Sequence, residues 1–312
     1  MDHWKQTAVI LVFCLLAGSA VIMPLSPRFF GNARMPSAKL LTAPAIPSTV
    51  PVPNLIAEAA LVYDPLHDTV IFEKKSAQTF GIASITKVMT ALVAFDRLGP
   101  EERILISRDA VLTEGSEGDL AVGEHFSLRD LAALMLTSSS NDAAAAMVEH
   151  IGRLYGAATF EESQIIFTRL MNEYAHGLNL TGTLFQNPTG LDLKENTSSA
   201  SNISTAHDLA LLMKHAYSHP LLADSAAAAS ITVYSDEGRK HHADTTHDVL
   251  ITNPGVISGK TGFTDAAGGA LLTVAEAPLG QLSIIVVLGS TREGRFTDTK
   301  ALLDWLRGRS EI

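Results

Sequence analysis

The order of strand and helix patterns along the chain is the feature that most limits its fold. Two short stretches with strand character, 57–63 and 69–73, flank a turn-forming segment and predict an early hairpin. Helical patterns then dominate as far as residue 217, and two apolar strand patterns, 270–276 and 281–289, come near the end. Neither group of strands can be buried alone, so we expect both to share one sheet. This predicts an α+β fold, an antiparallel sheet flanked by helices with an inserted helical lobe.

Start and stop signals locate the other elements. Ser127, followed by an acid three residues later, is typical of a helix N-cap, and Gly99-Pro100 ends an earlier helix. Helices are predicted at 84–98, 127–136, 143–151, 160–178, 205–217 and 297–306. Further strands are predicted at 103–107, 231–234, 246–252 and 257–261.

The N-terminal part of the chain differs in composition from the rest. Residues 8–25 carry no charge, and their length lies between that of a signal-peptide core and that of a membrane-spanning helix. The following residues are rich in proline and aperiodic, which indicates a semi-extended linker. We therefore predict a signal peptide or N-terminal membrane anchor at 1–25, a linker at 26–54 and a folded domain at 55–310.

Composition and residue spacing exclude several kinds of function. A net charge of −10 without a basic run argues against binding to nucleic acid. The single cysteine, Cys14, lies in the apolar N-terminal run, so the folded part has no disulfide or thiol chemistry. His241, His242 and His247 lack partners at metal-ligand spacing, so we predict a solvated hairpin there and expect no metal or cofactor.

Ser84 and Lys87 are the first candidate catalytic pair. They lie one helical turn apart on the same face, so a hydroxyl and an amine can form a hydrogen bond. A serine nucleophile needs a base, and lysine serves if burial or a second cation lowers its pKa. The free N–H groups of a first helical turn also favour developing negative charge. Because such a pair arises by chance, and Ser84 could simply cap the helix, the motif alone does not decide the function.

Two further motifs give this pair its meaning. S-x-x-K, S-x-N at 139–141 and K-T-G at 260–262 each occur once, in the order found in penicillin-binding proteins and class A β-lactamases. The surrounding residues resemble the D-alanyl-D-alanine carboxypeptidases, low-molecular-mass penicillin-binding proteins of the serine transpeptidase/β-lactamase-like fold. The similarity extends over about 57–306 and includes the segments 185–192, 204–210 and 259–268.

The resemblance implies catalytic roles for four residues. Ser84 would attack the carbonyl of a terminal D-Ala-D-Ala bond and form an acyl-enzyme, and Lys87 would take the Ser84 proton. Ser139 would relay a proton to the leaving amine. Asn141 would orient Lys87 or the substrate amide.

The same resemblance implies a binding role for the third motif and its neighbours. Lys260 would lower the pKa of Lys87 and attract the terminal carboxylate of the substrate, to which Thr261 would offer a hydroxyl. After Gly262, the backbone N–H of Phe263 would complete an oxyanion hole with that of the nucleophile. Arg295 matches the position of a basic residue that helps to hold the carboxylate in this family.

The expected function is that of a serine-type D-Ala-D-Ala carboxypeptidase, which trims peptidoglycan stem peptides and is inhibited by β-lactams. A D,D-endopeptidase of the same fold and a non-catalytic penicillin-binding sensor are the alternatives. A β-lactamase is disfavoured because no convincing glutamate motif for deacylation precedes Lys260. Two positions depart from the family pattern: the proline that often precedes the nucleophile is missing before Ser84, and Ser140 replaces the more usual small apolar residue or glycine. We expect export to the extracytoplasmic face of the cell membrane or the periplasm, with membrane attachment through the N-terminal segment.

Overall fold

The computed structural model describes residues 51–115, 118–192, 199–219, 222, 226–278 and 280–309. The predicted signal peptide or anchor and most of the predicted linker lie outside these residues, so the division into three regions stays a prediction. Within the described ranges, no helix has both the length and the apolar character needed to cross a membrane.

A five-stranded antiparallel sheet is the centre of the fold. Its strands lie in the order β2 (Thr69–Lys74), β1 (Ala59–Asp64), β11 (Leu282–Ser290), β10 (Gly268–Glu276) and β9 (Val256–Thr264). The prediction that the early hairpin joins the late strands is confirmed, because β1 pairs with β11 and Val62 lies opposite Ile285. β9 is an edge strand with no partner on its outer side among the described residues. The K-T-G motif therefore lies on a free edge of the sheet.

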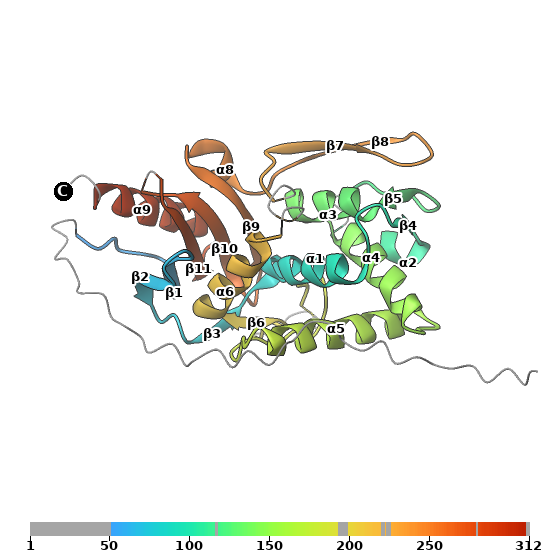
Figure 1. Cartoon of the computed structure of the whole chain (residues 1–312), viewed down its shortest axis with the longest axis horizontal. Coiled ribbons are helices and arrows are strands. Elements are labelled where there is room, and N and C mark those ends of the chain that lie inside the picture. Colours follow the sequence, from blue (N-terminus) through green and yellow to red (C-terminus); the bar gives the residue numbers. More distant parts are fainter. Residues whose placement is uncertain are drawn as a thin grey trace, which may run out of the picture. The chain divides into compact units, whose positions relative to one another are not determined.

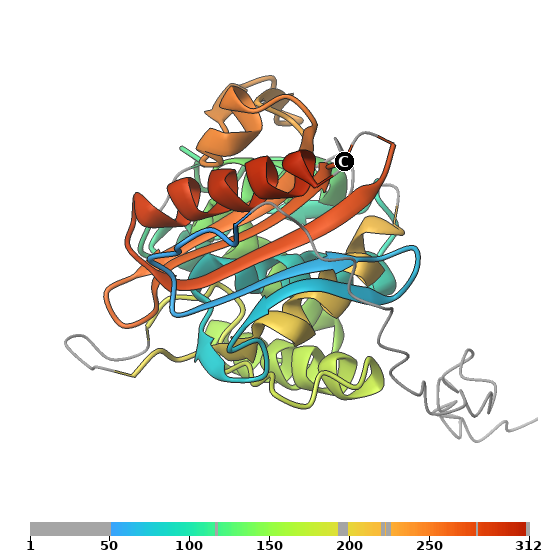
Figure 2. The ribbon, with the colours of Figure 1, turned by 90° about the vertical axis from the view of Figure 1, so that its left-hand side faces the viewer.

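The two faces of the sheet pack against different helices (Figures 1 and 2). Leu271 of β10 points into an apolar cluster with α9 (Gly294–Gly308), which crosses one face. Leu272, the next residue, points into the larger cluster formed with α1 (Thr86–Arg97) and α6 (Ala206–Tyr217). Neighbouring side chains in a strand point to opposite faces, and both faces are covered, so β10 is apolar along most of its length.

The inserted helices form a second lobe beside the sheet. These are α2 (Arg108–Val111), α3 (Leu128–Thr137), α4 (Asn141–Leu154) and α5 (Phe160–Gly177). The predicted N-cap of α3 is confirmed, since Ser127 Oγ accepts from the backbone N–H of Asp130 at 3.1 Å. Three short strand pairs complete the lobe and its surroundings: β3 (Thr79–Gly81) with β6 (Ile203–Thr205), β4 (Arg103–Leu105) with β5 (His125–Ser127), and β7 (Ser230–Tyr234) with β8 (Lys240–Asp244).

Two predictions for the histidine-containing segment are wrong. The predicted strand 246–252 contains the short helix α8 (Asp248–Thr252), and Nδ1 of its N-cap His247 accepts from the backbone N–H of Leu250 at 3.2 Å. The β-branched residues in this segment favour a strand locally, but the cap and the packing of α8 decide for a helix. His241 and His247 are buried and not solvated, whereas His242 is exposed as predicted.

A buried polar cluster holds the β7–β8 hairpin against the helical lobe, over which the hairpin extends (Figure 1). Glu124 accepts from His241 Nε2 at 2.9 Å and from the backbone N–H of Ala121 at 2.7 Å. The other ring nitrogen, Nδ1, lies 3.2 Å from the carbonyl oxygen of Gly118. The Glu124 carboxylate and the His241 ring are both buried, so this contact is shielded from water and joins the hairpin to the lobe.

Candidate active site

Ser84 and Lys87 lie together where the polypeptide enters α1. Lys87 Nζ is 3.0 Å from Ser84 Oγ, as their spacing in the sequence predicts. Ser84 belongs to the 3₁₀ turn η1 (Ala83–Ile85), and no side chain caps the following helix, so the Ser84 hydroxyl is not used as a helix cap. Ala83 has a φ of 44°, a left-handed value that is uncommon for alanine and typical of strained functional sites.

Lys87 has the environment that a lysine base requires. Its side chain is 0 % exposed, and Nζ donates a second hydrogen bond to the carbonyl oxygen of Thr189 at 2.7 Å. Burial lowers the pKa of Lys87 to about 7, against the opposing effect of the nearby Asp142 carboxylate. A substantial fraction of the amine is therefore neutral near pH 7 and can accept the Ser84 proton.

The loop that contains Thr189 is a part of the site that motif analysis misses. Thr90 Oγ1 donates to the carbonyl oxygen of Pro188 at 2.6 Å, on the turn of α1 that follows Lys87. A further contact with the start of α1 comes from Asn202, outside this loop, whose Nδ2 donates to Thr86 Oγ1 at 2.8 Å. The signal that points to this loop is its position in the family-like segment 185–192.

Gly190 lets this loop pass directly against the backbone of Ser84. It has a φ of 86°, and an ideal Cβ on Gly190 would lie 2.1 Å from the carbonyl oxygen of Ala83.

Gly190→Ala is therefore expected to displace the nucleophile and to lower the rate of Ser84 acylation by about a hundredfold, the effect of a misplacement of about 1 Å. Labelled-penicillin kinetics would measure it. Gly177→Ala, at a site with nothing within 4 Å, is the control, and an equal effect of both changes would refute the prediction.

The second predicted motif lies at the junction of α3 and α4. Asn141 is the first residue of α4, and Ser139 lies in the link before it with a φ of 68°. Asn141 Nδ2 donates to the carbonyl oxygen of Glu114 at 2.8 Å, whereas its Oδ1 is buried without a partner among the described residues. In the described part of the chain, neither Ser139 nor Asn141 forms a hydrogen bond to Lys87. Asp142, the next residue of α4, is close enough to influence the Lys87 pKa, so this junction lies near the base.

Ser140, one of the two departures from the family pattern, has a structural role. It is the N-cap of α4, and its Oγ accepts from the backbone N–H of Ala143 at 3.0 Å. It also forms a short hydrogen bond to Asp142. A serine at this position therefore stabilises the start of the helix that carries Asn141.

The third motif places a second lysine beside the first. The Lys260 side chain is only 1 % exposed, and its Nζ donates to the carbonyl oxygen of Thr261 at 3.0 Å. Burial lowers the pKa of Lys260 well below its ordinary value, and the positive charge of Lys87 lowers it further. The sequence analysis expected Lys260 to lower the pKa of Lys87. In the structure, burial is the main cause of the low Lys87 pKa.

Gly262 allows the edge strand to approach the nucleophile. An ideal Cβ on Gly262 would lie 2.6 Å from the carbonyl oxygen of Ile82 and 3.2 Å from the backbone nitrogen of Ser84. A larger residue would push β9 away from η1. The glycine of the K-T-G motif is therefore required by close packing of two backbones.

Polar groups from other elements gather along this part of β9. Thr261 Oγ1 lies 2.5 Å from Oγ1 of Thr246, a residue that the sequence analysis does not predict. Arg295 Nη1 donates to the carbonyl oxygen of Gly262 at 2.5 Å, while its Nε is buried without a partner in the described ranges. Phe263 follows directly, and the guanidinium of Arg292 lies over its ring. The structure thus brings Arg295 to the strand that the motif analysis selected.

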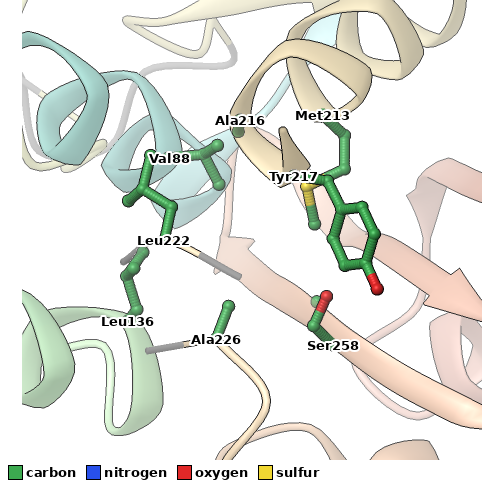
Figure 3. A pocket seen from close by; sticks show the side chains of 9 residues that line it. Val88, Leu136, Met213, Ala216, Tyr217, Leu222, Ala226 and Ser258 are labelled. Carbon is green, nitrogen blue, oxygen red and sulfur yellow. The ribbon is translucent and has the colours of Figure 1, made fainter. Parts of the chain in front are cut away.

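A small apolar pocket lies between the helices and the part of β9 that precedes Lys260 (Figure 3). Val88 of α1, Leu136 of α3, Met213 of α6 and Ser258 of β9 contribute to its lining. Its volume of about 10 Å³ has room for roughly one water molecule. None of the predicted site residues lines it, so we interpret it as packing space between helices and sheet.

Comparison with known proteins agrees with this geometry. The family described as D-alanyl-D-alanine carboxypeptidase matches residues 46–292. A D-alanyl-D-alanine endopeptidase of Pseudomonas aeruginosa is 29% identical over 260 residues, covering 81% of this chain and 78% of the relative. The D-alanyl-D-alanine carboxypeptidase DacB2 of Mycobacterium tuberculosis is 29% identical over 260 residues, covering 82% of this chain and 84% of the relative.

Solved structures show the same fold. The crystal structure of a D-alanyl-D-alanine carboxypeptidase from Mycobacterium tuberculosis has a TM-score of 0.71 and 28% identity, covering 82% of this chain and 92% of that one. The Streptomyces K15 DD-transpeptidase has a TM-score of 0.73 at 22% identity, covering 82% of this chain and 99% of that one. At this identity the likeness supports the fold alone. The predicted α+β, transpeptidase-like fold is confirmed. The chain belongs to the D-alanyl-D-alanine carboxypeptidase family and is a serine peptidase.

Proposed function

We propose that this protein hydrolyses the terminal D-Ala-D-Ala bond of peptidoglycan stem peptides through an acyl-enzyme on Ser84. The observation that carries the proposal is the buried Lys87 amine, 3.0 Å from Ser84 Oγ and with its pKa lowered to about 7. A neutral amine in this position can take the hydroxyl proton while Ser84 attacks the substrate carbonyl. Family membership supports the same reaction.

The reaction has two halves, and neither requires a cofactor. In the first, Ser84 Oγ bonds to the carbonyl carbon, the peptide C–N bond breaks, and the leaving amine receives a proton from Lys87 through Ser139. In the second, water attacks the ester with Lys87 again acting as base, which releases the shortened peptide and restores Ser84. The backbone N–H groups of Ser84 and Phe263 stabilise the oxyanion in both halves.

The free edge of β9 is suited to bind the peptide. An extended substrate can pair with an unpartnered edge strand, as in other proteins that add a peptide strand to a sheet. Gly262 lies against Ser84, so a peptide on this edge has its reactive bond beside the nucleophile. In the proposed complex, Lys260, Thr261 and Arg295 bind the terminal carboxylate. The Asn141 Oδ1, which has no partner among the described residues, would then accept a hydrogen bond from Lys87 or the substrate amide.

A D,D-endopeptidase is the second candidate function. The relative from Pseudomonas aeruginosa is named a D-alanyl-D-alanine endopeptidase, and its similarity matches that of the carboxypeptidase relatives. Such an enzyme cuts a D-Ala bond within a cross-link, where the leaving group carries a further peptide. The same Ser84 chemistry serves both reactions.

The proposed site of action is the extracytoplasmic side of the cell membrane, with attachment through the N-terminal segment. The uncharged run 8–25 and the proline-rich residues after it support export. β-Lactams are the expected covalent inhibitors, because their strained amide acylates the same serine.

The test uses the full chain, a diacyl-D-Ala-D-Ala peptide, a cross-linked peptide dimer and a labelled penicillin. We expect release of D-Ala and labelling of the wild type, and loss of both in Ser84→Ala. Label retained in Ser84→Ala, or neither label nor D-Ala release in the wild type, would overturn the assignment. Faster cleavage of the cross-linked dimer than of the D-Ala-D-Ala peptide would indicate an endopeptidase. Labelling without cleavage of either peptide would indicate a penicillin-binding sensor, and rapid turnover of penicillin would indicate a β-lactamase.

A further inference from the structure

A cation–π pair lies at the end of β9, beside the proposed site. Arg292, in the connection between β11 and α9, places its guanidinium carbon 3.9 Å from the centre of the Phe263 ring. Phe263 is half-buried and Arg292 is exposed. Within the described ranges, Arg292 has no carboxylate within ion-pair distance. Among the described residues it is thus a cation whose recorded contact is with an aromatic ring.

The surroundings of Arg292 are positive although the chain as a whole is acidic. Burial lowers the pKa of Arg295 to about 10, and the positive charge of Arg292 contributes to this, against the opposing effect of Glu293. Lys260 lies two residues before Gly262 on the same strand, and Arg295 influences its pKa as well. In a chain with a net charge of −10, the two neighbouring guanidinium groups of Arg292 and Arg295 favour an anionic group on the substrate.

The position of Phe263 decides which part of the substrate meets Arg292. Gly262 is the residue of β9 that lies against Ser84, so it marks the position of the reactive bond. Thr261 lies before Gly262 along β9, toward the end where the leaving group is proposed to bind. Phe263 lies after Gly262, in the opposite direction along the strand. A peptide antiparallel to β9 therefore carries its acyl portion, which stays on the serine, past Phe263 and Arg292.

We propose that Arg292, held on Phe263, binds a free side-chain carboxylate of the residue that precedes the reactive D-Ala. This inference rests on the proposed function and specifies its substrate class: a stem peptide with an acid at that position, in preference to the corresponding amide. The ring supports the guanidinium from one side and leaves its N–H edge free for a carboxylate. Because the cation is already positioned, less conformational freedom is lost on binding.

The experiment compares two acyl-D-Ala-D-Ala peptides that differ only in the side chain before D-Ala-D-Ala, a free carboxylate in one and its amide in the other. We expect the wild type to favour the acid in kcat/KM by about fivefold, the size typical of one exposed ion pair. Added salt should reduce this preference. Arg292→Gln should lower kcat/KM for the acid to that for the amide and leave the amide unchanged.

Arg309→Gln is the matched control, because Arg309 lies over the ring of Trp305 at 4.6 Å in a similar contact at the end of α9. It should keep the preference. A preference retained in Arg292→Gln, a preference absent from the wild type, or a lower kcat/KM for the amide peptide in Arg292→Gln would overturn the inference. Labelling of Arg292→Gln by penicillin at the wild-type rate reports that Ser84 is intact. If the wild type neither releases D-Ala nor takes up label, the proposed function itself has failed, which is a distinct result.

Discussion

Lys87→Met is expected to lower kcat/KM for a D-Ala-D-Ala peptide by about a thousandfold, within the range for loss of a general base. Methionine fills a similar volume, and the buried site loses an amine that is costly to desolvate, so the fold should persist. Ser84 keeps its hydroxyl but has no base within 3.0 Å. The measurements are D-Ala release and the rate of penicillin acylation.

The pH dependence gives the same prediction a second readout. Because burial lowers the pKa of Lys87 to about 7, the neutral base predominates above that pH and the protonated form below it. Wild-type kcat/KM should therefore rise with pH through about 7, and this step should vanish in Lys87→Met. Lys214→Met is the control, since Lys214 forms an exposed ion pair with Asp68. Full activity of Lys87→Met, or an unchanged pH step, would show that another group is the base.

Glu124→Ala is expected to destabilise the protein by about 3 kcal/mol, because it leaves buried hydrogen-bonding groups without their acceptor. The substitution leaves the His241 ring buried without its carboxylate and removes the acceptor of the Ala121 N–H. It also releases Arg239, whose Nε lies 4.0 Å from the same carboxylate. The free energy of unfolding, from urea denaturation followed by circular dichroism, measures the effect.

A double-mutant cycle separates the Glu124–His241 hydrogen bond from the packing of each side chain. Glu124→Ala, His241→Ala and the double variant should show a coupling of about 1–3 kcal/mol, because the two groups share a desolvated contact. His242→Ala is the control on the same hairpin, since that ring is exposed and should contribute less than about 0.5 kcal/mol. Additive effects would mean that the hairpin is held by packing alone.

The two wrong predictions have different physical causes, one distant in the chain and one local. His241 lies beside a second histidine in a polar stretch, which locally favours exposure, and Glu124 becomes its partner only because the hairpin folds back over the lobe. The 246–252 segment has strand-like residues, and its cap makes it helical. The low pKa of Lys87, which the sequence analysis attributed to Lys260, is due mainly to burial, and burial is a property of the whole fold.

The sequence by itself determined most of the element order, the shared sheet and the Ser84–Lys87 contact, because each follows from short-range periodicity or from burial that strands cannot achieve alone. It also determined the three motifs that locate the candidate site. Only the tertiary structure decided that the carbonyl of Thr189 holds Lys87, that Thr246 meets Thr261, and that Arg292 covers Phe263. These contacts join segments distant in sequence, and their geometry exists only once sheet and lobe have packed together.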